Sequence, residues 1–226
     1  MLPVIAIDGP SGSGKGTIAR RVAIALGFHL LDSGALYRLV ALVGEQRGLA
    51  ERDEAGHVEV ARKLPVQFGE DERGDERILL NGEDVSLEIR TEAAGAAASR
   101  VAAMPGVRTA LLERQHAFAR PPGLVADGRD MGTVVFPGAY LKIYLTASPE
   151  ERARRRHNQL KEKGVTVTIA DLSQEIRERD LRDSTRPVAP LRPAEDAVLL
   201  DSTGLSIEQV VDRVLALARS RLPAKS

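Results

Sequence analysis

The stretch VIAIDGPSGSGKGT, residues 4–17, decides the fold of this chain. Its first four residues form a short apolar run, which predicts a buried strand. The part GPSGSGK, residues 9–15, matches the pattern G-x-x-x-x-G-K, and apolar residues follow at helical spacing over 18–26. A glycine-rich turn alone is compatible with a plain connection, but strand, lysine and helix in this order predict a phosphate-binding loop.

The chemistry of phosphate binding explains these residue types. Small residues let successive backbone N–H groups point at phosphate oxygens, and the following helix presents its positive N-terminal end to the same anion. The lysine adds a mobile positive charge near the transferred phosphate. The predicted ATP-binding residues are Gly9, Pro10, Ser11, Gly12, Ser13, Gly14, Lys15, Gly16 and Thr17.

The residue after the lysine departs from the commonest form of this motif. Gly16 stands where Ser or Thr usually supplies a hydroxyl to magnesium, and Thr17 comes one position later. Gly-Lys-Gly-Thr resembles the nucleoside monophosphate kinases, which implies that phosphate oxygens and water hold the metal and that Thr17 lies near the α-phosphate. Asp8, Asp32 and Asp127 end predicted strands, so each is a candidate either for ordering the metal's waters or for a structural cap or ion pair.

Further strands alternate with helices along most of the chain. Short apolar runs at 29–31, 124–126, 141–145 and 197–200 each end near a polar or acidic residue. Helices are expected between most of them, one over 36–44. This alternation predicts an α/β fold, a P-loop NTPase-like three-layer sandwich with a five-stranded parallel sheet.

The segment of about residues 61–99 differs from this alternation. Residues 66–68 and 77–80 look like short antiparallel strands, and Asn81-Gly82 is a favoured hairpin turn because both residues tolerate positive φ. We expect a small insert on the main sheet.

Three helix starts carry capping signals. Thr91 is expected to cap an alanine-rich helix that runs toward Met104 and stops before Pro105. Ser148-Pro149-Glu150-Glu151 and Ser206-Ile207-Glu208-Gln209 both have the spacing of a capping box, in which the fourth side chain returns to the N-cap amide.

The composition excludes several classes of protein. Lys+Arg and Asp+Glu both total 32, whereas proteins that clamp long nucleic acids show a basic excess. The absence of cysteine excludes disulfides, thiol nucleophiles and Cys-ligated zinc. No apolar run approaches a membrane span and no signal peptide is recognisable, so a cytoplasmic protein without nucleic-acid or membrane partners is expected.

Three clusters of Arg and Asp point to a second anion site. Residues 32–38 and 127–133 follow predicted strands, and residues 179–186 lie near the end of a predicted helix. In open parallel sheets, ligands bind beyond the carboxyl ends of the strands. Solvated surface ion pairs are the alternative interpretation, and the position of Arg38 and Arg129 just after strand ends favours a binding role.

These clusters carry a resemblance that spans nearly the whole chain. Residues 9–17, 32–38, 89–91, 126–137 and 183–191, with the ending Leu200-Asp201-Ser202-Thr203, resemble the bacterial cytidylate kinase family. The resemblance implies a single kinase domain over 1–226, with an NMP-binding insert at about 61–99 and a lid at about 150–170. The insert is expected to close over the acceptor, and a purely structural role is the alternative.

The resemblance also implies roles at matching positions. Ser33, Arg38, Arg129 and Arg186 would hold the acceptor phosphate with Tyr37 beside them, Arg179 and Asp183 would hold the sugar, and Ser99, Arg108 and Asp130 would read the cytosine edge. An ionised Asp130 can accept from the exocyclic amine of cytosine, which uracil lacks. Without the resemblance, Ser99 and Arg108 are equally natural on solvated helix faces.

A helix rich in arginine is expected within the lid segment. Arg152, Arg155 and Arg156 lie in one helical neighbourhood, from which guanidinium groups could reach the phosphates, while Arg154 points elsewhere on the helix. The alternative is a charged, exposed helix. The predicted catalytic residues are Lys15, Arg129, Arg186, Arg152 and Arg156.

The expected reaction is direct in-line transfer from ATP to CMP or dCMP, with Mg²⁺ as cofactor and a monomeric enzyme. An acceptor phosphate oxygen is already ionised at neutral pH, so orientation and charge stabilisation suffice. The rival enzymes are small-acceptor kinases for UMP, AMP or shikimate. The non-enzyme rival is an ATP-hydrolysing switch, against which Gly16 argues.

Overall fold

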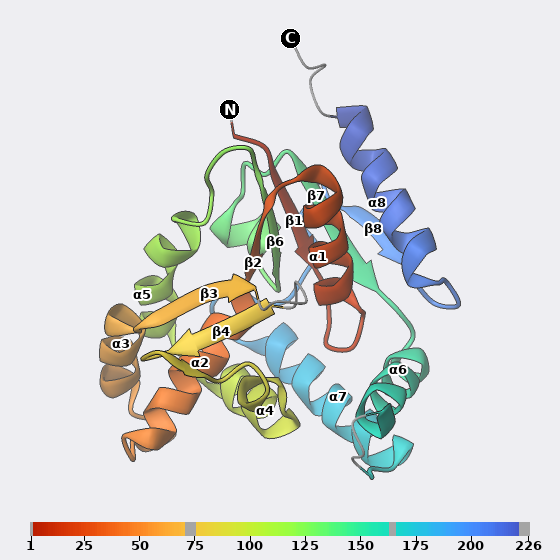
Figure 1. The fold of residues 1–226 in the computed structure, drawn as a ribbon. Helices are drawn as coiled ribbons and strands as arrows, with labels where there is room; N and C mark the ends of the chain where they lie inside the picture. The colour runs from red at the N-terminus through yellow and green to blue at the C-terminus, as the bar shows by residue number, and fades with distance from the viewer. Residues whose placement is uncertain (1, 71–75, 163–165, 222–226) are drawn as a thin grey trace. The chain divides into compact units, whose positions relative to one another are not determined.

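The computed structural model describes residues 2–70, 76–162 and 166–221. It contains two compact units, Met1–Asp32 with Gln115–Ser226, and Ser33–Arg114 (Figure 1). The expected insert at about 61–99 lies inside the second unit, whose bounds are wider, and its residues 71–75 lie outside the described residues. The expected lid at about 150–170 belongs to the first unit, and its residues 163–165 are likewise outside the description.

A five-stranded parallel sheet forms the centre of the first unit. The strand order is β2-β6-β1-β7-β8, and every neighbouring pair is parallel. The strands are β1 (Val4–Asp8), β2 (His29–Asp32), β6 (Leu124–Gly128), β7 (Leu141–Thr146) and β8 (Val198–Asp201). All five predicted strands are confirmed. Strand β1 is the central strand, so the loop that follows it starts at the middle of the sheet's carboxyl edge.

Helices α1 (Lys15–Leu26) and α8 (Ile207–Arg221) pack against this sheet and bury its apolar side chains. The unit also contains α6 (Pro149–Glu162) and α7 (Ile169–Thr185), which pack against each other, and one π-helical turn, η2 (Met131–Val135). Ile5 and Ile7 of β1 pack into one buried cluster with Val22 of α1 and Val214 of α8. Since side chains alternate along a strand, Asp8 points to the opposite face, where η2 contacts β1.

The second unit is built from helices and a small antiparallel sheet. Its elements are α2 (Ser33–Gln46), α3 (Glu54–Lys63), β3 (Val66–Glu70), β4 (Glu76–Leu80), β5 (Glu83–Asp84), η1 (Glu88–Arg90), α4 (Glu92–Val101) and the start of α5 (Pro105–His116). Helix α2 packs against α3 and α4. The predicted turn is confirmed, because Asn81 and Gly82 both have positive φ, 51° and 86°, between β4 and β5.

The structure confirms all three predicted N-caps but only one of the two predicted capping boxes. The Thr91 side chain accepts the Ala94 amide at 3.2 Å, although α4 ends at Val101, before Met104. The Ser206–Gln209 pair forms both bonds of a capping box, at 2.9 and 3.2 Å.

At the third start, Ser148 accepts the amide of Glu151 at 3.2 Å, but the reciprocal bond is absent. The Ser148 amide instead donates to the hydroxyl of Thr203 at 2.9 Å. The Glu151 carboxylate binds Arg154 and Arg155, because a charged guanidinium is a stronger partner than a backbone amide.

Candidate active site

The predicted phosphate loop joins β1 to α1, and its geometry suits an anion. Gly12 and Gly14 have φ values of 76° and 87°, which glycine adopts without strain. No side chain caps α1, and its first turn contains no acidic residue, so its N-terminal amides can be capped by a bound anion. Among the described residues, the buried Ser13 hydroxyl also has no hydrogen-bond partner.

Lys15 is the first residue of α1 and is almost fully buried, with 8% of its surface exposed. Its ammonium donates to the carbonyl oxygen of Pro10 at 3.1 Å. The pKa of Lys15 is lowered from 10.5 to about 7, mainly by burial and then by the charge of Arg129, against the opposite effect of Asp127. Because burial destabilises the charged form of Lys15, an anion bound beside it would stabilise the ammonium.

Two carboxylates at strand ends fit the hydration shell of a magnesium ion. A Cβ on Gly16 would lie 3.2 Å from Oδ2 of Asp127, so the missing side chain leaves room for this carboxylate beside the loop. Asp32 and Asp127 both act electrostatically on Lys15. Mg²⁺ prefers oxygen ligands and keeps several waters. Within the described residues, no group of three or more His, Asp or Glu side chains could hold a metal directly.

The carboxylate of Asp8, at the end of β1, binds two backbone amides of η2. Its two carboxylate oxygens accept the backbone amides of Met131 and Gly132, both at 2.8 Å. Burial raises the pKa of Asp8 to about 6, although these amides oppose the rise. Asp8 therefore anchors the start of η2, directly after Arg129 and Asp130, as in the structural-cap alternative given for it above.

Arg129 is held by a buried carboxylate from a helix far along the chain. Its Nε donates to Oδ2 of Asp183 in α7 at 2.9 Å, and only 17% and 5% of the two side chains are exposed. Burial by itself would lower the pKa of Arg129, but Asp183 and Asp127 outweigh it and raise the pKa above its ordinary value. Arg129 thus remains a fixed cation near Lys15.

Asp130 and Arg186 form a second, looser pair in the same unit. The closest atoms, Oδ1 of Asp130 and Nη2 of Arg186, are 3.8 Å apart, and both side chains are more than nine-tenths buried. Arg179 lies near enough to lower the pKa of Lys15. Arg129, Asp130, Arg179, Asp183 and Arg186 all belong to the first unit, where Arg129 pairs with Asp183 and Arg186 with Asp130.

The other predicted acceptor residues belong to the second unit. Ser33 is buried at the start of α2, and the guanidinium of Arg108 lies 5.5 Å from the centre of the Tyr37 ring. Ser99 and Arg108 are only 5% and 8% exposed, so the solvated-face interpretation is wrong for both.

Arg38 of the second unit lines a cavity of about 540 Å³, together with residues of α2, α3, η1 and α4.

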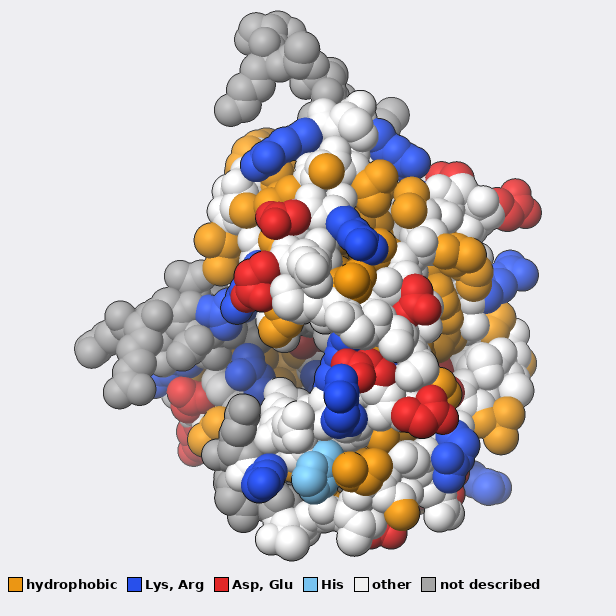
Figure 2. Space-filling view, turned by 90° about the vertical axis from the view of Figure 1, so that its right-hand side faces the viewer, with side chains coloured by type: hydrophobic (Ala, Val, Ile, Leu, Met, Phe, Trp, Pro, Cys, Tyr) orange, Lys and Arg blue, Asp and Glu red, His pale blue; other side chains and the backbone are white. Residues whose placement is uncertain are grey.

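The arginines of α6 have four different environments. Arg152 is buried and donates to the carbonyl of Ser11 at 2.9 Å, while it pairs with Asp180 at 2.6 Å. Arg155 reaches Ser13, whereas Arg156 donates to Gln159 of its own helix. Arg154 is 63% exposed, as expected from the helical wheel. On the face in Figure 2, basic side chains lie among acidic ones.

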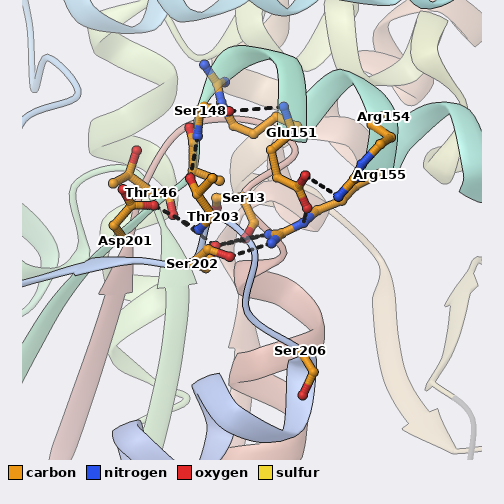
Figure 3. Close-up of polar contacts among 12 residues, drawn as sticks. Ser13, Thr146, Ser148, Glu151, Arg154, Arg155, Asp201, Ser202, Thr203 and Ser206 are labelled. Atoms are coloured by element: carbon orange, nitrogen blue, oxygen red, sulfur yellow. Dashed lines mark hydrogen bonds and ion pairs between the residues drawn. The ribbon is translucent and has the colours of Figure 1, made fainter.

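One cluster beside the loop was not singled out as a site from the sequence. Ser202, between β8 and α8, is 1% exposed and bonds to Arg155 and to the carbonyl of Thr146 (Figure 3). Thr203 follows it and accepts the Ser148 amide at the start of α6. The sequence signal was the polar run after the last predicted strand, which lies at the same sheet edge as the loop.

A glycine-rich loop at the carboxyl end of a central parallel strand, with a buried lysine at the following helix start, defines a P-loop protein. The family model for cytidylate kinase matches residues 5–220. The chain therefore belongs to the cytidylate kinase family, which consists of nucleoside monophosphate kinases.

Several curated relatives are similar over almost their entire length. A cytidylate kinase of Stutzerimonas stutzeri is 60% identical over 97% of this chain and 96% of its own. One from Colwellia psychrerythraea is 57% identical over 97% of each chain, and one from Nitrosomonas eutropha is 59% identical over 96% and 94%. The chain of this protein thus matches whole kinases rather than fragments. No helix in the described residues is both long and apolar enough to cross a membrane.

Proposed function

We propose that this chain transfers the γ-phosphoryl group of ATP to CMP or dCMP, giving CDP or dCDP. The observation that carries the proposal is the uncapped start of α1 behind a glycine-rich loop with a buried, electrostatically destabilised Lys15. Membership of the cytidylate kinase family supports the choice of acceptor. The reaction is in-line and needs no covalent enzyme intermediate.

The donor triphosphate binds along Gly9–Thr17. Backbone amides of the loop and of the first turn of α1 donate to the phosphates, and the Ser13 hydroxyl is available as a further donor. Lys15 carries its charge next to the transferred group. Asp32 and Asp127 would hold Mg²⁺ through its waters, and the ion would neutralise phosphate charge when bound.

A second set of residues binds the acceptor. Ser33, Arg38, Arg129 and Arg186 bind its phosphate. Arg179 and Asp183 bind the sugar. The base is read by a third set, Ser99, Arg108 and Asp130, with Tyr37 beside Arg108. Fixed guanidinium groups suit this role because they stabilise charge without reorganising during transfer.

Segments at the edges of the site complete the proposal. Residues of about 61–99 close over the acceptor, and a lid at about 150–170 excludes water from the transferring group. Arg152 and Arg156 stabilise charge on the phosphates from this lid. We place the enzyme in the cytoplasm as a monomer.

A panel of acceptors with ATP and Mg²⁺ tests the proposal directly. CMP and dCMP should be phosphorylated at least about tenfold faster than UMP, because only cytosine offers an amine to Asp130. AMP and shikimate should be poorer still. Equal rates with UMP and CMP would remove the role given to Asp130, and ATP hydrolysis unaffected by any acceptor would favour a nucleotide switch.

The pKa of Lys15 predicts that nucleotide binding takes up a proton. At pH 8.5 most of the free enzyme has a neutral Lys15, since the pKa is about 7. A bound phosphate stabilises the ammonium, so ADP or ATP binding should take up close to one proton at pH 8.5 and almost none at pH 6. Calorimetry in buffers with different ionisation enthalpies measures this uptake.

The matched control for the proton uptake is Lys15→Arg, which keeps a cation that cannot lose its proton in this range. Any nucleotide binding that remains in this variant should show no uptake at either pH. An uptake in the wild type that does not change between pH 6 and 8.5 would contradict the assignment to Lys15.

A further inference from the structure

Two arginines of α6, one turn apart, contact carbonyl groups of the phosphate loop. Arg152 Nη1 donates to the oxygen of Ser11 at 2.9 Å, and Arg155 Nη1 donates to the oxygen of Ser13 at 3.2 Å. Residues three apart on a helix share a face, so both contacts come from the same side of α6. These carbonyls therefore point toward α6.

The Arg155 side chain is fixed by three other contacts. Its Nη1 donates to the hydroxyl of Ser202 at 3.0 Å, and its Nη2 donates to the Ser202 carbonyl at 2.6 Å. Nε donates to Oε1 of Glu151 at 2.8 Å. Figure 3 shows the guanidinium between Glu151 and Ser202. A side chain held on both sides can impose its geometry on the loop it touches.

Ser202 itself is attached to the sheet. Its amide and its hydroxyl both donate to the carbonyl of Thr146, at 2.8 and 2.9 Å, and only 1% of the residue is exposed. Thr146 is the last residue of β7, next to β1. Strand β7, Ser202 and Arg155 thus form a continuous chain of hydrogen bonds that ends on the phosphate loop.

The loop needs such an external contact because its own residues leave its orientation open. Ser13 lies between Gly12 and Gly14, both with positive φ, and glycine populates positive and negative φ about equally well. Rotation of the peptide group between Ser13 and Gly14 would turn the Ser13 carbonyl inward and the Gly14 amide outward. A bond from a charged donor favours the outward carbonyl by more than a bond from a neutral donor would.

We propose that Arg155 is a positioning residue that, fixed by Ser202 and Glu151, holds the Ser13 carbonyl outward and so directs the loop amides toward the donor phosphates. The proposal rests on the donor site proposed above. It gives Arg155 a role different from a direct phosphate contact, because the guanidinium acts through the loop backbone. It also gives the polar run after β8 a function in donor binding.

The test compares Arg155→Gln with Arg154→Gln. Arg154 is the matched control, because it binds the same Glu151 but projects into solvent. In the free protein, amides of residues 9–17 should exchange hydrogen faster in Arg155→Gln than in the wild type or the control. ATP affinity should fall about tenfold, as expected for loss of a charge-assisted hydrogen bond, while kcat at saturating ATP falls less than about threefold.

Ser202→Ala is a second, milder variant. It removes the hydroxyl, and with it the contacts to Arg155, to the Thr146 carbonyl and, at 3.5 Å, to the Ser13 carbonyl, while the bond from Arg155 to the Ser202 carbonyl remains. It should shift loop exchange and ATP affinity in the same direction by smaller factors, and Ser202→Thr should restore them.

Unchanged loop exchange with weaker ATP binding would overturn the proposal in favour of direct contact between Arg155 and the nucleotide. No change in either quantity would overturn it as well. If the wild type bound no ATP, the proposed function would fail, whereas the exchange comparison in the free protein would still decide the role of Arg155.

Discussion

Replacing Lys15 with methionine is expected to lower kcat/KM for ATP at least about a thousandfold while it stabilises the free protein. The loss follows because the ammonium acts where charge develops on the transferred group, in a site from which water is excluded. Steady-state kinetics with CMP as acceptor measure it. Lys142→Met is the matched control, because Lys142 is another buried lysine of the first unit but its ammonium pairs with Asp196.

The gain in stability has the same physical origin as the low pKa. Between about pH 7 and 10.5, the unfolded chain binds a proton at Lys15 that the folded chain has released. The wild type therefore becomes more stable as the pH rises through this window, and below it the charged, buried ammonium opposes folding. Methionine removes this term, which we expect to raise the free energy of unfolding by roughly 1–4 kcal/mol at pH 7.

Thermal unfolding of both proteins at pH 7 and pH 9.5 tests this sign. The advantage of Lys15→Met over the wild type should shrink at the higher pH. A variant that is less stable than the wild type at pH 7, or one that keeps near-normal turnover, would contradict the role of Lys15.

Local patterns were sufficient to predict the sheet and the loop. The five strands are short apolar runs that end at polar residues. Such runs are typical of the strands of a parallel sheet, because helices bury both of its faces. Thr91 and Ser206 were predictable as caps because their partners lie within three residues. Helix α3 carried the same kind of signal, since Asp53 accepts the Gly56 amide, and could have been found from it.

Partners far apart in the sequence could not be predicted in the same way. Glu151 has a capping spacing, yet it binds two arginines that the helix brings to it, and Thr203 takes over the Ser148 amide. Asp8 meets the amides of η2, more than a hundred residues away. Such contacts depend on which elements the fold brings together. The sequence around Asp8 does not indicate that η2 will lie beside it.

The burial of Ser99 and Arg108 shows a further limit. Ser99 lies on the alanine-rich helix α4 and Arg108 on α5, and a polar or charged side chain on either helix is compatible with a solvated face. Only the packing of α4 against α2, and of Arg108 over Tyr37, places them inside.

Replacing Asp130 with asparagine is expected to remove most of the preference for cytosine. The kcat/KM for CMP should fall about a hundredfold, whereas that for UMP should fall by a smaller factor or rise. A carboxylate only accepts hydrogen bonds and so suits the amine of cytosine, while an asparagine amide can rotate and donate to the carbonyl oxygen of uracil. The acceptor panel, repeated with this variant, measures the ratio of the two constants.

The ratio separates base recognition from the structural role of Asp130. Its carboxylate lies 3.8 Å from Arg186 in a buried pair, so the substitution also disturbs a group proposed to bind the acceptor phosphate. That disturbance lowers the rates with CMP and UMP by the same factor and cancels in the ratio. Asp196→Asn, which removes an exposed carboxylate of the same unit, should leave the ratio unchanged. Equal losses for both acceptors in Asp130→Asn would mean that Asp130 only orients Arg186, and that another group selects cytosine.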